Sequence, residues 1–142
     1  MMRFLKEQIN NYTILAKMEE KEILEEIPTK HYKITIQPTL LIHILQNFVQ
    51  NAIKFTPKGG HITIRAYSNK EGFHIFVIDE GIGIDESKDL FAPFKRYGNQ
   101  TGAGLGLFLA KSAADAIGAK ITLKNRTDRE GTIASLLIPH KI

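Results

Sequence analysis

The spacing of apolar residues along the chain predicts three helices. From residue 40 to residue 55 the apolar positions recur every three or four residues, which is the period of an amphipathic helix. Another such helix is predicted over residues 105–117, where it opens after glycines and closes at Gly118. Residues 3–26 also place apolar side chains at helical spacing, so a first helix is expected there, before Pro28.

Alternation of apolar and polar residues, with many β-branched side chains, predicts five strands. They cover residues 32–37, 61–67, 72–78, 119–125 and 132–139. Two pairs of these strands are adjacent and joined by short turns, which indicates an antiparallel or mixed sheet with helices over one face. The other segments are predicted as a glycine-punctuated loop at 79–85, a short helix at 88–91 and a long polar loop at 94–104.

Composition and charge narrow the classes of function. The 142 residues fit one domain, and the lack of cysteine excludes disulfides and thiolate metal sites. The net charge of +4 is spread along the chain without a basic run, so we expect no nucleic-acid interface, whereas a polyanionic nucleotide suits this charge. No apolar stretch is long enough to cross a bilayer, so we expect a soluble fragment without membrane contact.

Two asparagines four residues apart form the first candidate site. Asn47 and Asn51 emerge from the same face of the helix predicted at 40–55. Their carboxamide oxygens suit Mg²⁺, a hard ion that takes oxygen ligands and substrate phosphates. Lys54 can place a positive charge near those phosphates, and the Phe55 ring can stack on a base. Taken alone, the pair is equally consistent with two solvent-facing amides beside a core stripe.

Glycine-rich turns supply two more candidate patches. Asp79 follows a predicted strand, and its carboxylate suits an exocyclic amine such as that of adenine. Gly81 and Gly83 come next and let a backbone approach a flat ligand. The segment GAGLGL at 102–107 opens a helix, whose free amide groups form an anion site. Its context excludes a Rossmann site or a P-loop, because it follows a polar loop and no Gly-Lys-Ser/Thr closes it.

The fourth patch brackets a proline with two aromatic residues, in the segment FAPF at 91–94. This composition indicates a stiff hinge at the start of the long loop. The cations that follow, Lys95 and Arg96, can approach phosphates when such a loop closes. For Lys95 an ordinary solvated charge is an equally good interpretation.

In this order and spacing, the four patches closely resemble the catalytic ATP-binding domain of bacterial sensor histidine kinases, within the Bergerat-fold ATPases. The resemblance runs from about residue 40 to residue 139. NFVQNAIKFTPKGG resembles the asparagine box, DEGIGI the first glycine box, FAPF the phenylalanine box and GAGLGLFLAK the second glycine box. It implies an α/β two-layer sandwich, with a mixed, mostly antiparallel sheet under about three helices, and it implies binding of ATP and Mg²⁺.

The resemblance also implies a role for each matched residue. Asn51 and Asn47 would hold the metal, and Lys54 and Arg96 would face the phosphates as further catalytic residues. Asp79 would accept the adenine amine. The other nucleotide-binding residues would be Phe55, Gly81, Ile82, Gly83, Ile84, Phe91, Tyr97, Gly102, Gly104, Leu105, Gly106, Leu107 and Thr132.

One substitution separates two branches of these ATPases. Hydrolytic members carry a glutamate where Asn47 stands, and an amide cannot take a proton from water at neutral pH. The resemblance therefore implies transfer of the γ-phosphate to an external acceptor. In this family the acceptor is a histidine on a dimerisation domain of the same protein, and a response regulator is the indirect partner.

The phosphoacceptor itself is not expected in this chain. None of the five histidines, His31, His43, His61, His74 and His140, has the sequence setting of the family's acceptor. We expect residues 31–142 to be the catalytic domain and residues 1–30 a helical remnant of the dimerisation hairpin or its linker. The fragment is expected to be a monomer and the cytoplasmic portion of a membrane-anchored kinase. Two alternatives stay open: a stand-alone serine kinase of the anti-sigma-factor type, and a degenerate nucleotide-binding interaction module.

Overall fold

The computed structural model of the chain describes residues 2–27, 38–84 and 106–139. Five strands in these segments form one sheet, in the order β1-β2-β3-β5-β4. β1 pairs with β2 in parallel, and the other three pairings are antiparallel, as the predicted mixed sheet requires. The elements are α1 (Met2–Met18), β1 (Glu22–Glu26), α2 (Pro38–Phe55), β2 (His61–Ser68), β3 (Gly72–Ile78), α3 (Gly106–Ala116), β4 (Lys120–Asn125) and β5 (Thr132–Pro139).

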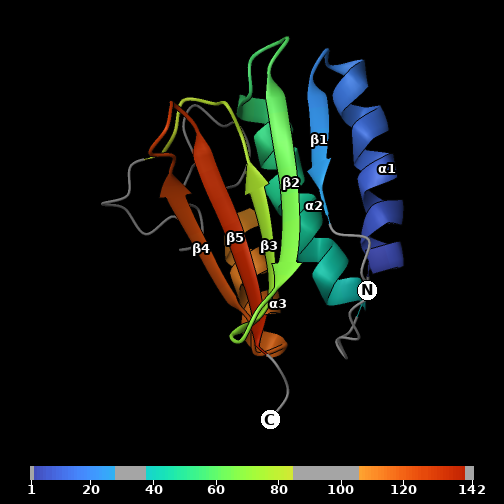
Figure 1. The fold of residues 1–142 in the computed structure, drawn as a ribbon, viewed down its shortest axis with the longest axis vertical. Helices are drawn as coiled ribbons and strands as arrows, with labels where there is room; N and C mark the ends of the chain where they lie inside the picture. The colour runs from blue at the N-terminus through green and yellow to red at the C-terminus, as the bar shows by residue number, and fades with distance from the viewer. Residues whose placement is uncertain (1, 28–37, 85–105, 140–142) are drawn as a thin grey trace.

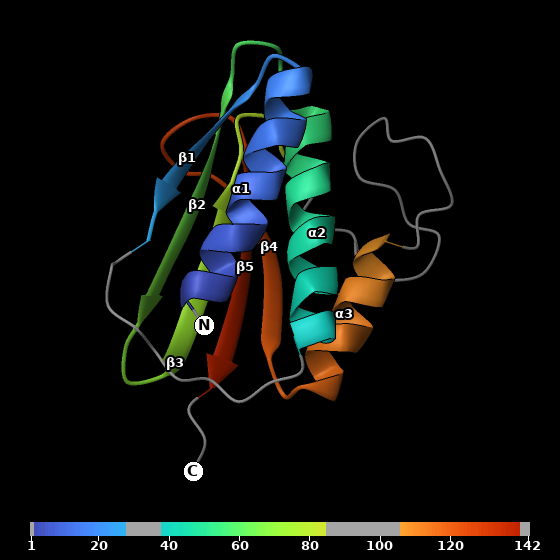
Figure 2. The same ribbon diagram turned by 90° about the vertical axis from the view of Figure 1, so that its right-hand side faces the viewer.

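The molecule has two layers, with α1, α2 and α3 on one face of the sheet (Figure 1 and Figure 2). Burial alternates along β2 and β5, so every second side chain points toward the helices. The core between the layers is built from large apolar side chains of α2 and the central strands, including Leu41, Ile44, Phe48, Ile62, Ile64, Phe73, Ile75 and Leu136. The predicted two-layer sandwich with three helices over one face is confirmed.

The first helix is shorter than predicted. α1 ends at Met18, Glu20 has a φ of 60°, and residues 22–26 form β1. Glu22 and Glu26 pair with His61 and Arg65 at the edge of β2. The prediction of one helix through residue 26 is wrong, because backbone pairing with this sheet edge outweighs the helical preference of a glutamate-rich segment.

α1 contributes to the same hydrophobic core as α2 and the sheet. Its buried residues are Leu5, Ile9, Tyr12 and Ala16, spaced three and four apart along one helical face. The division of the chain near residue 30 stays a prediction. The strand predicted at 32–37, the short helix at 88–91 and the loop at 94–104 lie outside the described residues. No helix among the described residues is long and apolar enough to span a membrane.

Candidate functional site

Those predicted site residues that the structure describes lie at one end of the sheet. There α2 and β3 end, α3 begins, and the turn between β4 and β5 closes (Figure 1 and Figure 2). A narrow cavity of about 10 Å³ lies at this end. Its lining includes residues from the asparagine helix, the aspartate loop, the second glycine segment and β5, namely Phe48, Asn51, Ala52, Val77, Asp79, Leu107, Leu123, Thr132 and Ala134. Patches that lie far apart in the sequence therefore meet around one cavity.

Asp79 is held by the backbone on both sides. Its side chain is 4% exposed, and Oδ1 accepts hydrogen bonds from the backbone N–H groups of Gly81 at 3.0 Å and Thr132 at 2.9 Å. Its own N–H donates to the Thr132 carbonyl at 2.9 Å. Burial raises the pKa of the Asp79 carboxyl, while these two bonds and the nearby Arg126 guanidinium lower it. The result is a buried acceptor fixed in one orientation.

Thr132 places a second polar group beside Asp79. Its side chain is buried, and Oγ1 has no hydrogen-bond partner among the described residues. An unpaired buried hydroxyl costs about 1–3 kcal/mol, so such a group is unusual unless something else bonds to it. Because Thr132 lines the same cavity as Asp79, the two side chains place a hydroxyl and a carboxylate at one space.

The first glycine segment depends on close backbone approach. A Cβ on Gly81 would lie 3.0 Å from the Phe55 carbonyl oxygen, at the end of α2. Gly83 has a φ of +85°, which favours glycine, and a Cβ there would lie 2.6 Å from Oδ1 of Asn125. Both glycines therefore let this loop pack against its neighbours.

Asn125 and Arg126, at the end of β4, support this loop and were missed by the sequence reasoning. The Asn125 carboxamide accepts a hydrogen bond from the Ile84 N–H and donates one to the Ile84 carbonyl, both at 2.8 Å. Nη1 of Arg126 donates to the Asp79 carbonyl at 3.0 Å, and its other nitrogens bind Asp128 at 2.9 and 2.8 Å. The turn between β4 and β5 was predicted, but a polar pair beside a turn carries no signal that it reaches across to another loop.

The asparagine side of the site is less constrained. Asn47 and Asn51 are half-buried on the same face of α2, as their spacing predicts, and Asn51 Nδ2 lies 3.4 Å from Asn47 Oδ1. Each carboxamide carries an oxygen of the kind that a hard cation such as Mg²⁺ takes as a ligand. The Lys54 side chain is exposed, with Nζ 6.0 Å from the centre of the Phe55 ring.

Apolar side chains form one wall near the cavity. Leu107, near the start of α3, packs with Phe55, Ile84 and Leu123 in a small cluster that is separate from the main core. Ile82 does not join this cluster, because its side chain is 58% exposed. Gly106 is the first residue of α3. The predicted site residues Phe91, Arg96, Tyr97, Gly102, Gly104 and Leu105 lie outside the described residues.

Residues 36–142 match the sequence model of a family described as histidine kinase-, DNA gyrase B-, and HSP90-like ATPase. Sensor histidine kinase WalK of Bacillus subtilis is 30% identical over 150 residues, which cover 99% of this chain and 24% of WalK. Sensor protein BasS of Salmonella typhimurium is 40% identical over 103 residues, covering 70% of this chain and 29% of BasS. The chain thus spans about a quarter of the length of these two relatives.

The fold is also found in solved structures. The catalytic domain of histidine kinase ThkA has a TM-score of 0.80 and 27% identity, over 95% of this chain and 91% of that domain. These findings confirm the expected fold and the resemblance to a histidine-kinase catalytic domain. The role of each site residue stays a prediction.

Proposed function

Because the chain belongs to the family of histidine kinase-, DNA gyrase B- and HSP90-like ATPases, we propose that it binds Mg·ATP and donates the γ-phosphate to a histidine on a separate phosphoacceptor domain. One observation carries this proposal: Asn51, Asp79 and Thr132 line the same cavity. A buried acceptor, a hydroxyl without a partner among the described residues, and an amide whose oxygen can take a metal are groups that suit the two ends of a magnesium nucleotide.

The adenine would bind at the sheet end of the cavity, whose walls would have to move apart, because a space of about 10 Å³ holds no more than about one water molecule. In this proposal the Asp79 carboxylate accepts a hydrogen bond from the exocyclic amine, and the Thr132 hydroxyl bonds to the same edge of the base. Gly81 and Gly83 keep the loop close to the ring. Phe55 and Leu107 supply apolar contact, which fits their place in one cluster with Ile84.

The metal and phosphates would lie along α2. Asn51 and Asn47 would hold Mg²⁺ through their amide oxygens, and bound Mg²⁺ would neutralise part of the phosphate charge. Lys54 would add a positive charge, since its exposed side chain follows Asn51 by one turn. Arg96 and the glycine segment at 102–106 would complete the phosphate side.

The chemistry of Asn47 favours transfer over hydrolysis. An amide takes no proton from water at neutral pH, so this residue cannot act as a general base. In the proposed reaction an imidazole nitrogen of the acceptor forms a bond to the γ-phosphorus, the bond from that phosphorus to the β,γ-bridging oxygen breaks, and ADP leaves. WalK and BasS are named as sensor proteins, so we propose that this chain is the corresponding cytoplasmic portion of a kinase whose phosphate reaches a response regulator.

Calorimetric titration of the 142-residue chain with Mg·ATP tests the first half of the proposal. We expect one site with a dissociation constant between about 1 μM and 1 mM, the range usual for enzyme substrates. No detectable binding under conditions where the chain is folded would sink the proposed function.

A phosphotransfer assay tests the second half. The chain, with labelled Mg·ATP, is mixed with a histidine-bearing helical hairpin from a related sensor kinase. We expect label on the hairpin that is lost in acid, as phosphohistidine is. Acid-stable label on a serine-bearing partner would favour the serine-kinase alternative, and tight binding with no transfer would favour a binding module.

A further inference from the structure

The corner between α1 and β1 has a defined backbone structure. Glu20 N–H donates to the Lys17 carbonyl at 3.1 Å, and Lys21 N–H donates to the Ala16 carbonyl at 3.0 Å. Together with the φ of 60° at Glu20, these bonds form a Schellman motif, which ends α1. The motif turns the chain so that Lys21 leaves the helix axis and faces the end of α2.

Lys21 uses its side chain to cap α2. The side chain is only 8% exposed, and Nζ donates a hydrogen bond to the carbonyl oxygen of Ile53. The last four carbonyls of a helix lack partners within the helix, and Ile53 is two residues from the end of α2. A positive charge at this position also opposes the negative end of the helix dipole. Lys21 is therefore a C-terminal cap supplied from another element.

Backbone bonds on both sides of Lys21 hold it against the turn after α2. Gly59 N–H donates to the Glu20 carbonyl at 2.8 Å, and Glu22 N–H donates to the Gly60 carbonyl at 3.1 Å. Three consecutive residues of the corner thus bond to residues 53–60. These bonds leave the Lys21 side chain little freedom to rotate away from α2.

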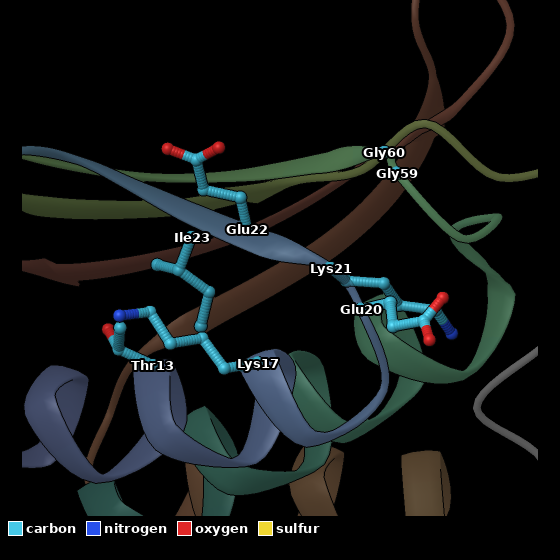
Figure 3. Close-up of a pocket in the computed structure, with 8 residues that line it drawn as sticks. All are labelled: Thr13, Lys17, Glu20, Lys21, Glu22, Ile23, Gly59 and Gly60. Carbon is cyan, nitrogen blue, oxygen red and sulfur yellow. The ribbon is translucent and has the colours of Figure 1, made fainter.

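Lys17 provides an internal contrast. It lines the same open cavity of about 390 Å³ as Lys21 and Thr13, but its side chain is exposed and points along α1 toward Thr13 (Figure 3). Lys21 extends the other way, toward the end of α2 (Figure 3). Lys17 and Lys21 therefore carry the same charge and line the same cavity, but their side chains extend in different directions, and it is Lys21 that bonds to α2.

The residues near Ile53 along α2 belong to the asparagine side of the site, where the proposed function puts the metal; we call it the metal side. Asn51 precedes Ile53 by two residues, and Phe55, two residues after it, packs so close to Gly81 that a Cβ there would lie 3.0 Å from the Phe55 carbonyl oxygen. We propose that Lys21 is a positioning residue, which holds the last turn of α2 so that Asn51 meets the magnesium of the bound nucleotide. This inference rests on the proposed function.

The test compares Lys21→Met, which keeps the apolar stem, with Lys21→Arg and with the matched control Lys17→Met. Each variant is titrated with ADP in excess Mg²⁺ and again in EDTA, at a temperature where circular dichroism shows it folded. We expect Lys21→Met to weaken Mg·ADP binding by about tenfold, the effect of losing one charge-assisted cap, and to weaken ADP in EDTA much less. Lys21→Arg retains a donor and should stay within about threefold of the unchanged chain, as should Lys17→Met.

The ratio of the two dissociation constants is the deciding readout, because a general loss of stability does not change it. An unchanged ratio in Lys21→Met, whether both affinities fall together or neither falls, overturns the positioning role. So does an equal effect of Lys17→Met. Failure of the unchanged chain to bind either form of ADP contradicts the proposed function instead.

Discussion

The two sides of the candidate site are built differently. On the base side, Asp79 accepts two backbone hydrogen bonds and donates a third from its own N–H, and Asn125 binds both polar atoms of the Ile84 backbone. On the metal side, Asn47 and Asn51 are half-buried and share one long contact of 3.4 Å. A hydrogen bond of that length is weak.

This difference indicates which part of recognition exists before a ligand binds. The base side is oriented by backbone that the fold itself fixes, so in the proposed function a base would meet a prepared acceptor at little entropic cost. The metal side has the right atoms on one helical face, but the described residues give the two amides only the long bond between them to fix their rotamers. We expect it to become ordered only when metal and phosphates supply the missing partners.

The largest expected effect is on the base side, at Asp79. Asp79→Asn keeps an oxygen that can accept the bonds from Gly81 and Thr132, but it turns the second carboxylate oxygen into a donor. A donor facing the adenine amine removes a bond to a charged group, so we expect Mg·ATP affinity to fall about 100-fold. Titration with Mg·ITP checks the assignment, because the variant should lose the preference for ATP over ITP.

The stability of Asp79→Asn, and the pH dependence of stability in the unchanged chain, distinguish a role of Asp79 in ligand recognition from a role in folding. Since burial raises the pKa of Asp79, the folded chain holds that proton more tightly than the unfolded chain. The ionised carboxylate therefore lowers stability at neutral pH, and this loss is recovered as the pH falls through the folded-state pKa. Asp79→Asn should unfold no more easily than the unchanged chain at pH 7 in a denaturant titration. Strong destabilisation would mean that the carboxylate is a structural group.

The second effect concerns the metal side, at Asn51. Asn51→Ala should lower Mg·ADP affinity by about 20-fold, because one metal ligand is lost, while ADP in EDTA binds as before. Calorimetry with and without metal measures both. An equal loss in EDTA would contradict the comparison, since Asn51 would then contact the base side through the shared cavity.

The sequence predicted the residues of both sides but not the contrast between them. The four-residue spacing of Asn47 and Asn51 was enough to put both amides on one face of α2, because helical periodicity is local. Asp79 and Thr132 are 53 residues apart, and their hydrogen bond depends on the pairing of β3 with β5. Only the resemblance to a family linked them.

Contacts between turns could not be predicted from local sequence patterns either, because they too join residues that are far apart in the sequence. In the sequence, Asn125 is the polar last residue of a predicted strand, and nothing near it indicates that it binds Ile84. β1 was missed because its glutamate-rich segment has good helix propensity, and only the edge of β2 makes it a strand. Long-range pairing decided each of these cases.

The third effect tests how rigid the base side is. Gly83→Ala puts a side chain at a φ of +85° and a Cβ 2.6 Å from Asn125 Oδ1. A strained residue of this kind costs about 1–3 kcal/mol, and we expect ADP affinity in EDTA to fall about fivefold to tenfold as the loop shifts. Combining it with Asn125→Ala removes the clash but not the strain, so part of the affinity should not return. Full recovery in the double variant would show that the backbone conformation at Gly83 is unimportant.

The smallest effect is expected at Thr132. There, affinities measured with and without Mg²⁺ distinguish the base side from the metal side most clearly. Thr132→Val keeps the shape of the side chain and removes a buried hydroxyl that has no partner among the described residues. The unfolding free energy should therefore stay the same or rise by up to about 1 kcal/mol, since the hydroxyl makes no bond to the part of the chain that the structure describes. Affinity for ADP should fall about threefold to fivefold in Mg²⁺ and in EDTA alike, because the lost bond is to the base. Thr63→Val, on β2 and not part of the cavity lining, is the matched control and should leave affinity unchanged. If Thr132→Val lost affinity for ADP only when Mg²⁺ is present, Thr132 would belong to the metal side. Destabilisation of this variant by more than about 1 kcal/mol would mean that the Thr132 hydroxyl bonds within the protein.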